Sequence, residues 1–89
     1  MKIISAASAG TLESSDAYVE IEPTQKGNCL QIESVVMEQF GDAIEQTVHA
    51  VLRELSVENA SVRLIDRGAL DCVIRARVET ALLRGGEKV

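Results

Sequence analysis

The sequence predicts an α+β fold: a small single domain whose antiparallel or mixed sheet of three to four strands carries two helices packed on one face. Two observations support this prediction. Short segments alternate apolar and polar residues with the period of a half-buried strand, and two longer segments repeat apolar residues at helical spacing. The 89 residues, 46% of them hydrophobic, supply material for one core, and a chain of this length buries roughly 60–65% of its unfolded surface.

The opening segment is only weakly patterned. Within residues 1–16, Ile3–Ile4 is the candidate for a short edge strand, and we expect the segment to be flexible and to end in a polar loop. The run from 17 to 22 then alternates cleanly, which predicts a half-buried strand. Its inward residues are expected to be Ala17, Val19 and Ile21.

Turn chemistry predicts a reversal of the chain after this strand. Pro23 ends the alternating run, and the residues TQKGN at 24–28 are typical of a hairpin turn. We therefore expect a second strand over 29–33 that returns along the first and points Leu30 and Ile32 inward.

A helix of about 20 residues is expected next, because an apolar stripe begins after a residue suited to helix capping. Ser34 is the expected N-cap. The stripe, at spacings of three and four, consists of Val36, Phe40, Ile44, Val48, Val51 and Leu55. The opposite side of this helix is polar, and its residues Glu38, Asp42 and Glu45 form a candidate docking surface for a partner.

The last part of the chain is predicted to add one strand and one helix. Residues 61–66 alternate, with Val62 and Leu64 inward. Residues 70–84 fit strand and helix periods over a short window, but the helical template accounts for more of the segment. Gly85–Gly86 is a typical helix ending, so we predict a helix over 70–84 and a frayed tail over 85–89.

Composition excludes several classes of function. The net charge of −5 argues against binding to nucleic acid and against attraction to an anionic membrane surface. No apolar run approaches the ~20 residues of a membrane span, and the apolar stretch after Lys2 is shorter than that of a signal peptide. Cys29 and Cys72 fit no metal-binding spacing, so we expect two free, partly buried thiols in a cytoplasmic protein.

The residues that could carry chemistry do not form a catalytic pattern. His49 is the only histidine and lies on the polar side of a predicted helix, with no nucleophile placed to pair with it. Asp66 and Asp71 are best explained as a turn residue and a first-turn helix acid. Glu13 and Asp16 would make only a weak metal site on a loop. We therefore expect no independent catalytic residues and no metal ligands.

The loop AGTLESSDA at 9–17 is the most distinctive stretch of the chain. It is polar and carries two adjacent serines, Ser14 and Ser15, just ahead of a strand. A serine in an exposed loop can receive a phosphate-linked group from a partner enzyme, because that enzyme supplies the activation. A small acidic carrier or helper domain, docking on basic patches of larger partners, fits these features.

Four blocks in order resemble one family, the acyl carrier protein of citrate lyase, which is its gamma subunit. The blocks are AGTLESSD at 9–16, QFGDAI at 39–44, IDRGALDC at 65–72 and VIRARVETALLR at 73–84. The resemblance covers nearly the whole chain and implies one acyl carrier domain over 1–89, which is not itself an enzyme. The carrier protein of malonate decarboxylase is a more distant relative.

The resemblance implies a covalently attached cofactor. In this family phosphoribosyl-dephospho-coenzyme A is joined through a phosphodiester to the serine that follows the glutamate of GTLES, which here is Ser14. Ser15 is the alternative attachment residue. Fatty-acid-type carriers place their serine in an Asp-Ser-Leu motif at a helix start, whereas here Ser15 precedes Asp16 and leads into a strand. Asp16 is a candidate for orienting the attachment enzyme or its metal ion.

The resemblance also implies partners and a reaction. The alpha subunit would exchange acetyl for citryl on the thiol of the arm, and the beta subunit would cleave the citryl thioester to oxaloacetate and restore the acetyl form. A prosthetic-group transferase would attach the arm, and an acetate ligase would acetylate its thiol. The alternatives left open are a malonate decarboxylase-type carrier and a structural or regulatory subunit with a phosphorylatable serine loop.

Overall fold

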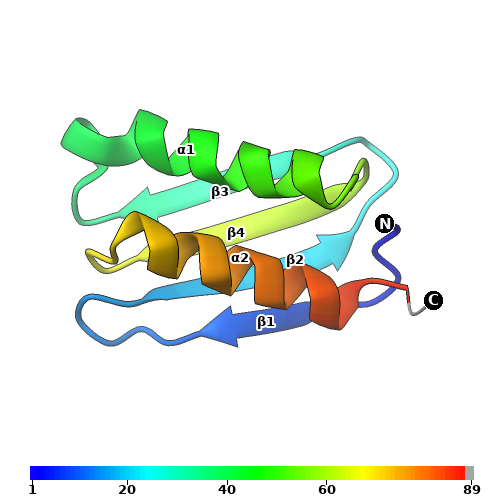
Figure 1. The fold of residues 1–89 in the computed structure, drawn as a ribbon, viewed down its shortest axis with the longest axis horizontal. Helices are drawn as coiled ribbons and strands as arrows, with labels where there is room; N and C mark the ends of the chain where they lie inside the picture. Colours follow the sequence, from blue (N-terminus) through cyan, green and yellow to red (C-terminus); the bar gives the residue numbers. More distant parts are fainter. Residues whose placement is uncertain (88–89) are drawn as a thin grey trace.

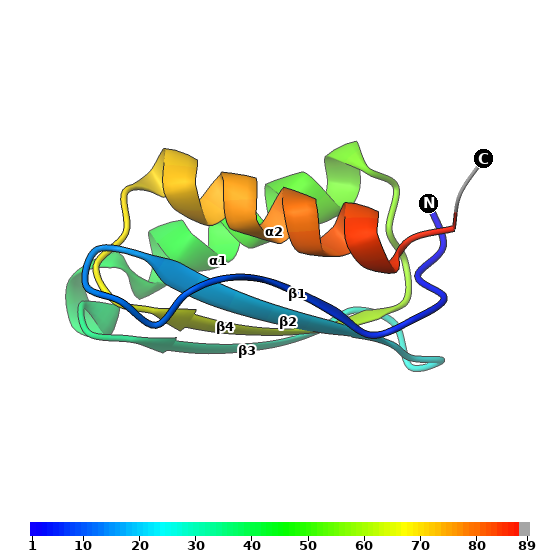
Figure 2. The same ribbon diagram turned by 90° about the horizontal axis from the view of Figure 1, so that it is seen from below.

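The structure of the protein is a computed structural model, in which residues 1–87 are described. Over these residues one four-stranded sheet carries two helices on the same face (Figure 1, Figure 2). The elements in chain order are β1 (Ala7–Gly10), β2 (Ala17–Pro23), β3 (Cys29–Ser34), α1 (Met37–Glu54), β4 (Ala60–Asp66) and α2 (Asp71–Gly85). The predicted α+β fold is confirmed, as is the helix at the end of the chain.

The order of strands in the sheet is β1-β2-β4-β3, so β4 lies between β2 and β3. β4 pairs antiparallel with β2 and parallel with β3, and α1 supplies the crossover that a parallel pair requires. The predicted hairpin between β2 and β3 is therefore wrong. The connection at 24–28 instead spans about 10 Å, the width of two strand spacings. Turn residues favour a chain reversal, but they do not decide which strand later takes the neighbouring place.

The edge strand at the start of the chain lies later than its pattern suggests. Ile3 makes only an isolated bridge, to Gly86, whereas Ala7–Gly10 pairs along β2. The prediction of an edge strand at Ile3–Ile4 is therefore wrong. The domain limits, the flexibility of 1–16 and the fraying of 85–89 stay predictions, and residues 88–89 of that tail lie outside the described part of the chain.

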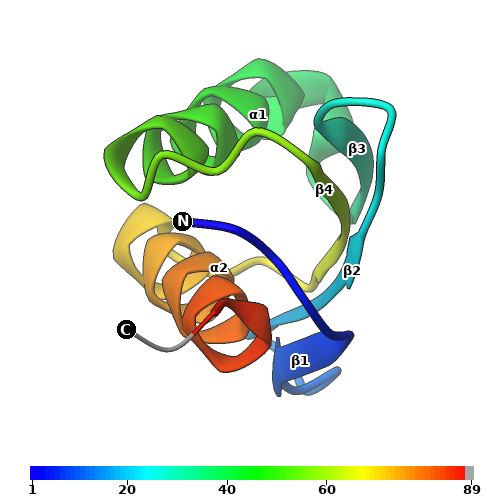
Figure 3. The same cartoon turned by 90° about the vertical axis from the view of Figure 1, so that its right-hand side faces the viewer.

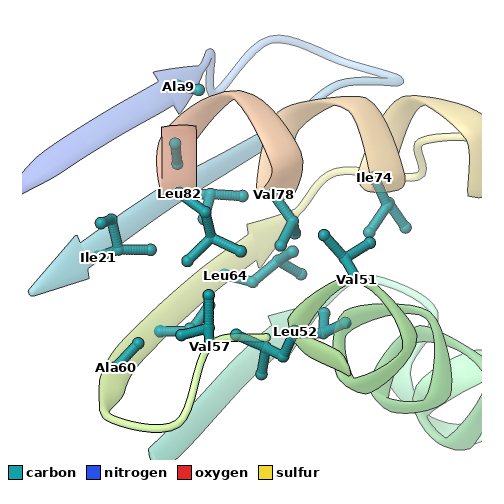
Figure 4. Close-up of a cluster of buried hydrophobic side chains, with 14 of the residues drawn as sticks. Ala9, Ile21, Val51, Leu52, Val57, Ala60, Leu64, Ile74, Val78 and Leu82 are labelled. Atoms are coloured by element: carbon teal, nitrogen blue, oxygen red, sulfur yellow. The ribbon is translucent and has the colours of Figure 1, made fainter. Parts of the chain in front are cut away.

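The core lies between the helices and the sheet (Figure 4). The inward positions predicted for β2 and β4 are confirmed, since their side chains are almost completely buried. Val48 of α1, Leu64 of β4 and Val78 of α2 each have 0% exposure and belong to one buried cluster. Figure 3 shows both helices on one side of the curved sheet, with the N-terminus and the end of α2 at the near end of the molecule.

The start of α1 differs from the prediction. The helix begins at Met37, and its N-cap residue Val36 has no side-chain capping bond. The hydroxyl of Ser34 accepts a hydrogen bond from the Val36 N–H at 3.1 Å but donates its proton to Asp66 at 2.8 Å. Ser34 therefore ties β3 to β4 and is not the helix cap. Phe40 was predicted for the buried stripe, but it is 54% exposed, and burial of that stripe starts at Ile44.

The connections gather at the two ends of the sheet (Figure 1). One end carries the β1–β2 loop, the β3–α1 connection and the β4–α2 loop. The other end carries the N-terminus and the end of α2 together with the β2–β3 and α1–β4 connections. None of the helices within residues 1–87 has the length and apolar character needed to cross a membrane.

Candidate attachment site

Ser14 lies at the tip of the β1–β2 loop, which spans residues 11–16. The Asp16 N–H donates to the Glu13 carbonyl at 3.2 Å, which closes a turn with Ser14 and Ser15 at its two central positions. Ser15 adopts a left-handed conformation with φ of +65°, and both serines are exposed. The turn therefore presents two neighbouring hydroxyls on differently shaped backbone.

Gly10 allows β1 to enter this loop. Its φ of +94° is in the left-handed region that side chains disfavour. A Cβ atom at this position would also overlap the carbonyl oxygen of Ala17 and press on the side chain of Arg77. The end of β1 and the start of β2 can approach this closely only because residue 10 is a glycine.

Asp16 is the first anchor of the loop. Arg77 of α2 binds its carboxylate with two parallel bonds, from Nε to Oδ1 and from Nη2 to Oδ2, both at 3.0 Å. The Thr11 hydroxyl donates to Oδ2 at 2.7 Å, and the Ala17 N–H donates to Oδ1 at 2.7 Å. These hydrogen bonds, with that of Arg77 the largest and that of Thr11 next, hold the pKa of Asp16 well below its usual range.

These contacts give Asp16 a structural role. Both of its oxygens are engaged within the chain, and only 15% of the side chain is exposed. The structure therefore gives no support to the idea that Asp16 orients an enzyme or a metal ion. No cluster of three or more potential metal ligands occurs among residues 1–87.

Arg67 of the β4–α2 loop is the second anchor. Its carbonyl accepts a bond from the Ser15 N–H and its own N–H donates to the Asp16 carbonyl, both at 2.9 Å. Its guanidinium donates to the Leu12 carbonyl at 3.2 Å. These bonds hold the loop on both sides of Ser14, while Ser14 itself is exposed.

The sequence reasoning found the serines but missed both arginines. Arg67 and Arg77 lie far from the loop in the chain, and only the fold brings them to it. One signal was present for Arg77: no acidic residue lies three or four positions from it in the helix, so it had no local partner.

The other candidate residues take structural positions. His49 faces Glu45 one turn earlier at 3.6 Å on the exposed side of α1. Asp66 is 1% exposed and accepts bonds from Ser34 and from the Gly68 and Ala69 N–H groups. Asp71, the first residue of α2, accepts a hydrogen bond from the hydroxyl of Thr47 in α1.

Both cysteines are free, as predicted, but their predicted partial burial is wrong. Cys29 lies on β3 and Cys72 in the first turn of α2, and both are exposed. The first points away from the helices, because residues at odd positions of β3 face the open side of the sheet.

This arrangement is typical of one class of protein. An exposed serine stands on a loop that is fixed from two other elements. Such a serine is open to modification by another enzyme. The fold and the site are therefore those expected of a carrier protein.

Comparison with known proteins identifies the family. A family model described as malonate decarboxylase delta subunit (MdcD), designated ACP, matches residues 4–85. The chain is 53% identical over 89 residues to citrate lyase acyl carrier protein 2 of Salmonella typhimurium, covering 99% of this chain and 92% of the relative. It is 55% identical over 85 residues to citrate lyase acyl carrier protein of Serratia proteamaculans, covering 94% and 83%.

The chain belongs to this family of acyl carrier proteins. The resemblance to the citrate lyase carriers noted in the sequence is confirmed, and the role of the chain is that of a non-catalytic acyl carrier subunit. An acyl carrier protein holds its acyl group on a covalently attached prosthetic group, and this chain is the carrier of a multi-subunit complex.

Solved structures show the same fold. A chain of a Pseudomonas malonate decarboxylase hetero-tetramer, crystallised with malonate, superimposes with a TM-score of 0.78 at 21% identity, covering 92% of this chain and 84% of that one. A Thermus thermophilus protein matches with a TM-score of 0.67 at 10% identity, and the match covers 94% of this chain but 16% of that longer one. At these identities the likeness concerns the fold alone.

Proposed function

We propose that this chain is the acyl carrier subunit of citrate lyase and that phosphoribosyl-dephospho-coenzyme A is attached to Ser14 through a phosphodiester. The carrier would present acetyl and citryl groups to the alpha and beta subunits during conversion of citrate to acetate and oxaloacetate. The observation that carries the attachment site is the exposure of Ser14 on a loop that two anchors hold in place. The choice of citrate lyase rests on the relatives at 51–55% identity.

The residues present fit such an attachment. The Ser14 hydroxyl is exposed, so a transferase can reach it, remove its proton and join its oxygen to phosphorus as the leaving group departs from the donor. Ser15 is the alternative, but its N–H is bonded to Arg67 and its backbone is left-handed. These constraints make Ser14 the better attachment residue.

When bound, the group supplies a thiol on a long flexible arm that holds acyl groups as thioesters. The chain contributes a fixed base for that arm, because Arg67 and Arg77 hold the loop against the body of the domain. A tethered group reaches two active sites without dissociating, which raises its effective concentration at each.

The other partners follow from the same proposal. They are the prosthetic-group transferase and the acetate ligase that acts on the arm thiol, all in the cytoplasm. Glu38, Asp42 and Glu45 are exposed along α1 and remain the candidate docking surface for basic patches of these partners.

A malonate decarboxylase-type carrier is the second candidate. The description of the matching family and the 0.78 TM-score to a chain of the Pseudomonas hetero-tetramer favour it. Sequence identity favours citrate lyase, since it is 21% to the Pseudomonas chain but 53% to the Salmonella typhimurium carrier.

The test is the intact mass of the protein isolated with its native partners, followed by fragmentation across residues 9–22. We expect a mass excess equal to phosphoribosyl-dephospho-coenzyme A, located on Ser14. The same excess on Ser15 would keep the function and move the site. An unmodified or merely phosphorylated chain in an active citrate lyase complex would overturn the attachment and favour a structural or regulatory subunit.

A further inference from the structure

An apolar pocket of about 370 Å³ opens between the starts of the two helices. We call it the α1–α2 pocket. It is formed by Phe40 and Ile44 of α1, by Ile74 of α2 and by Leu70 from the loop between β4 and α2. Its size is at the low end of the range for small-molecule sites, which is about 300–1,000 Å³. It suits a small group or the end of a longer one.

Two side chains at this pocket are exposed to an extent that the fold does not require. Phe40 is 54% exposed and Leu70 is 72% exposed, although both are large and apolar. Exposed apolar residues gathered around a hollow mark a site of interaction. A larger hollow of about 620 Å³ lies at the opposite end of the molecule beside the N-terminus, but its lining is mainly polar.

The α1–α2 pocket and the loop of Ser14 are joined by one segment of chain. Arg67 bonds to the backbone of Ser15, and the next residues, Gly68 to Leu70, form a wall of the pocket. Figure 1 shows the β1–β2 loop, the β4–α2 loop and the start of α1 at the same end of the molecule. A flexible arm on Ser14 therefore starts beside this pocket.

Charge at the pocket restricts what can enter it. Its lining contains no lysine or arginine and includes the exposed Asp71 at the start of α2, whereas the carboxylate of Asp66 is buried and bonded within the chain. A neutral apolar group can enter such a site, whereas a group with carboxylates of its own would meet the charge of Asp71 without a lysine or arginine to balance it.

We propose that the α1–α2 pocket shelters the end of the prosthetic arm in its thiol and acetyl-thioester forms and excludes the citryl form, an inference that rests on the proposed attachment at Ser14. The carrier then protects its acetyl thioester from water between turnovers. The citryl group stays outside, where the lyase subunit can take it.

The test is NMR of the full-length chain in its apo, thiol, acetyl and citryl forms, with attachment verified by mass. We expect acetylation to shift the signals of Phe40, Leu70 and Ile74, and citryl loading to leave them at their apo positions. Shifts confined to residues 11–16 in a chain shown to carry the arm would overturn the proposal and leave the pocket for a partner subunit. Equal shifts with the citryl form would overturn the exclusion by charge.

A second readout uses matched variants that keep the fold. Leu70→Ala should make cleavage of the acetyl thioester by hydroxylamine severalfold faster, since the arm loses its cover. Leu83→Ala removes an equally apolar side chain, 54% exposed, from the far end of α2 and should leave the rate unchanged. Equal rates for both variants and the wild type would overturn the proposal.

A third measurement separates this inference from the proposed function. S-acetylpantetheine, titrated into the Ser14→Ala chain, needs no attachment. Shifts at Phe40 and Leu70 would support the pocket even if native protein proved to carry no arm. If these signals do not shift at a high concentration of S-acetylpantetheine, while native protein does carry the arm on Ser14, the proposed binding to the pocket is wrong and the proposed attachment still stands.

Discussion

Two loops at opposite ends of the sheet use a left-handed glycine in different ways. Gly10, with φ of +94°, opens the β1–β2 loop, and Gly27, with φ of +80°, lies in the β2–β3 connection. A Cβ on Gly27 would meet no atom within 4 Å, whereas one on Gly10 would overlap the backbone of Ala17. The first loop is thus packed against the body of the domain and the second is open around its glycine.

The two loops also differ in what holds them. The β2–β3 connection is fixed by Asn28, which donates to the Val57 carbonyl at 2.9 Å and accepts from the Ala60 N–H at 3.0 Å. The β1–β2 loop is held by the charged side chains of Arg67 and Arg77 and by the backbone of Arg67. One connection is thus fixed by an uncharged side chain, whereas the loop of Ser14 is fixed by two charged ones.

The largest contrast should appear between Gly10→Ala and Gly27→Ala. Both replacements place a side chain at positive φ, which costs about 1–2 kcal/mol. Only the first adds a backbone clash, so we expect it to lower the free energy of unfolding by about 3–4 kcal/mol. Urea unfolding measures both. Similar losses for the two variants would show that the close approach at residue 10 is unimportant.

A smaller contrast is expected between Arg77→Ala and Arg63→Ala. Arg77 binds Asp16 in a pair whose carboxylate is only 15% exposed, whereas Arg63 faces Glu20 at 3.4 Å with exposures of 51% and 42%. Exposed pairs contribute about 0–1 kcal/mol, so Arg63→Ala should change little. Thermal unfolding should show a clear drop in Tm for Arg77→Ala, accompanied by slower attachment at Ser14. Unchanged attachment would contradict the role of Arg77 as an anchor.

The same pair predicts a dependence on pH. The pKa of Asp16 lies below its ordinary value of 3.8 in the folded protein, so its ionised form stabilises the fold. That contribution is complete above about pH 5 and is lost as pH falls through the folded pKa, because the unfolded chain takes up its proton first. The stability gap between wild type and Asp16→Asn should therefore be constant near neutrality and narrow in acid. A difference in stability between the two proteins that grows as the pH falls would contradict a lowered pKa of Asp16 in the folded state.

The smallest effect is expected at Ser15. Its φ of +65° suits glycine, so Ser15→Gly relieves backbone strain while it loosens the unfolded chain. These terms oppose each other, and the free energy of unfolding should change by less than about 0.5 kcal/mol. Attachment should proceed at the wild-type rate. A loss of attachment would mean that the Ser15 side chain takes part.

Local patterns predicted what depends on local sequence. Alternation located β2 and β4, and helical spacing located α2, because burial of one side imposes a period on these segments. β1 was missed because the residues ASAG carry no such contrast, and their pairing with β2 is made by backbone groups.

Contacts between distant segments could not be predicted in this way. Ser34 is a residue type that often caps helices, but its hydroxyl donates a hydrogen bond to Asp66 instead. The turn residues at 24–28 predict that β2 and β3 pair, but β4 lies between these two strands. The serines of the site could be found by resemblance, since their motif is local. Arg67 and Arg77, which hold that motif, come from the β4–α2 loop and from α2, and only the fold places them there.

We propose above all that the anchored loop offers Ser14, and not Ser15, for attachment. The most direct measurement is loading by the transferase of the wild-type chain, Ser14→Ala and Ser15→Ala, followed by intact mass. We expect the wild type and Ser15→Ala to gain the mass of the prosthetic group and Ser14→Ala to gain none. A fully loaded Ser14→Ala chain together with an unloaded Ser15→Ala chain would contradict the account.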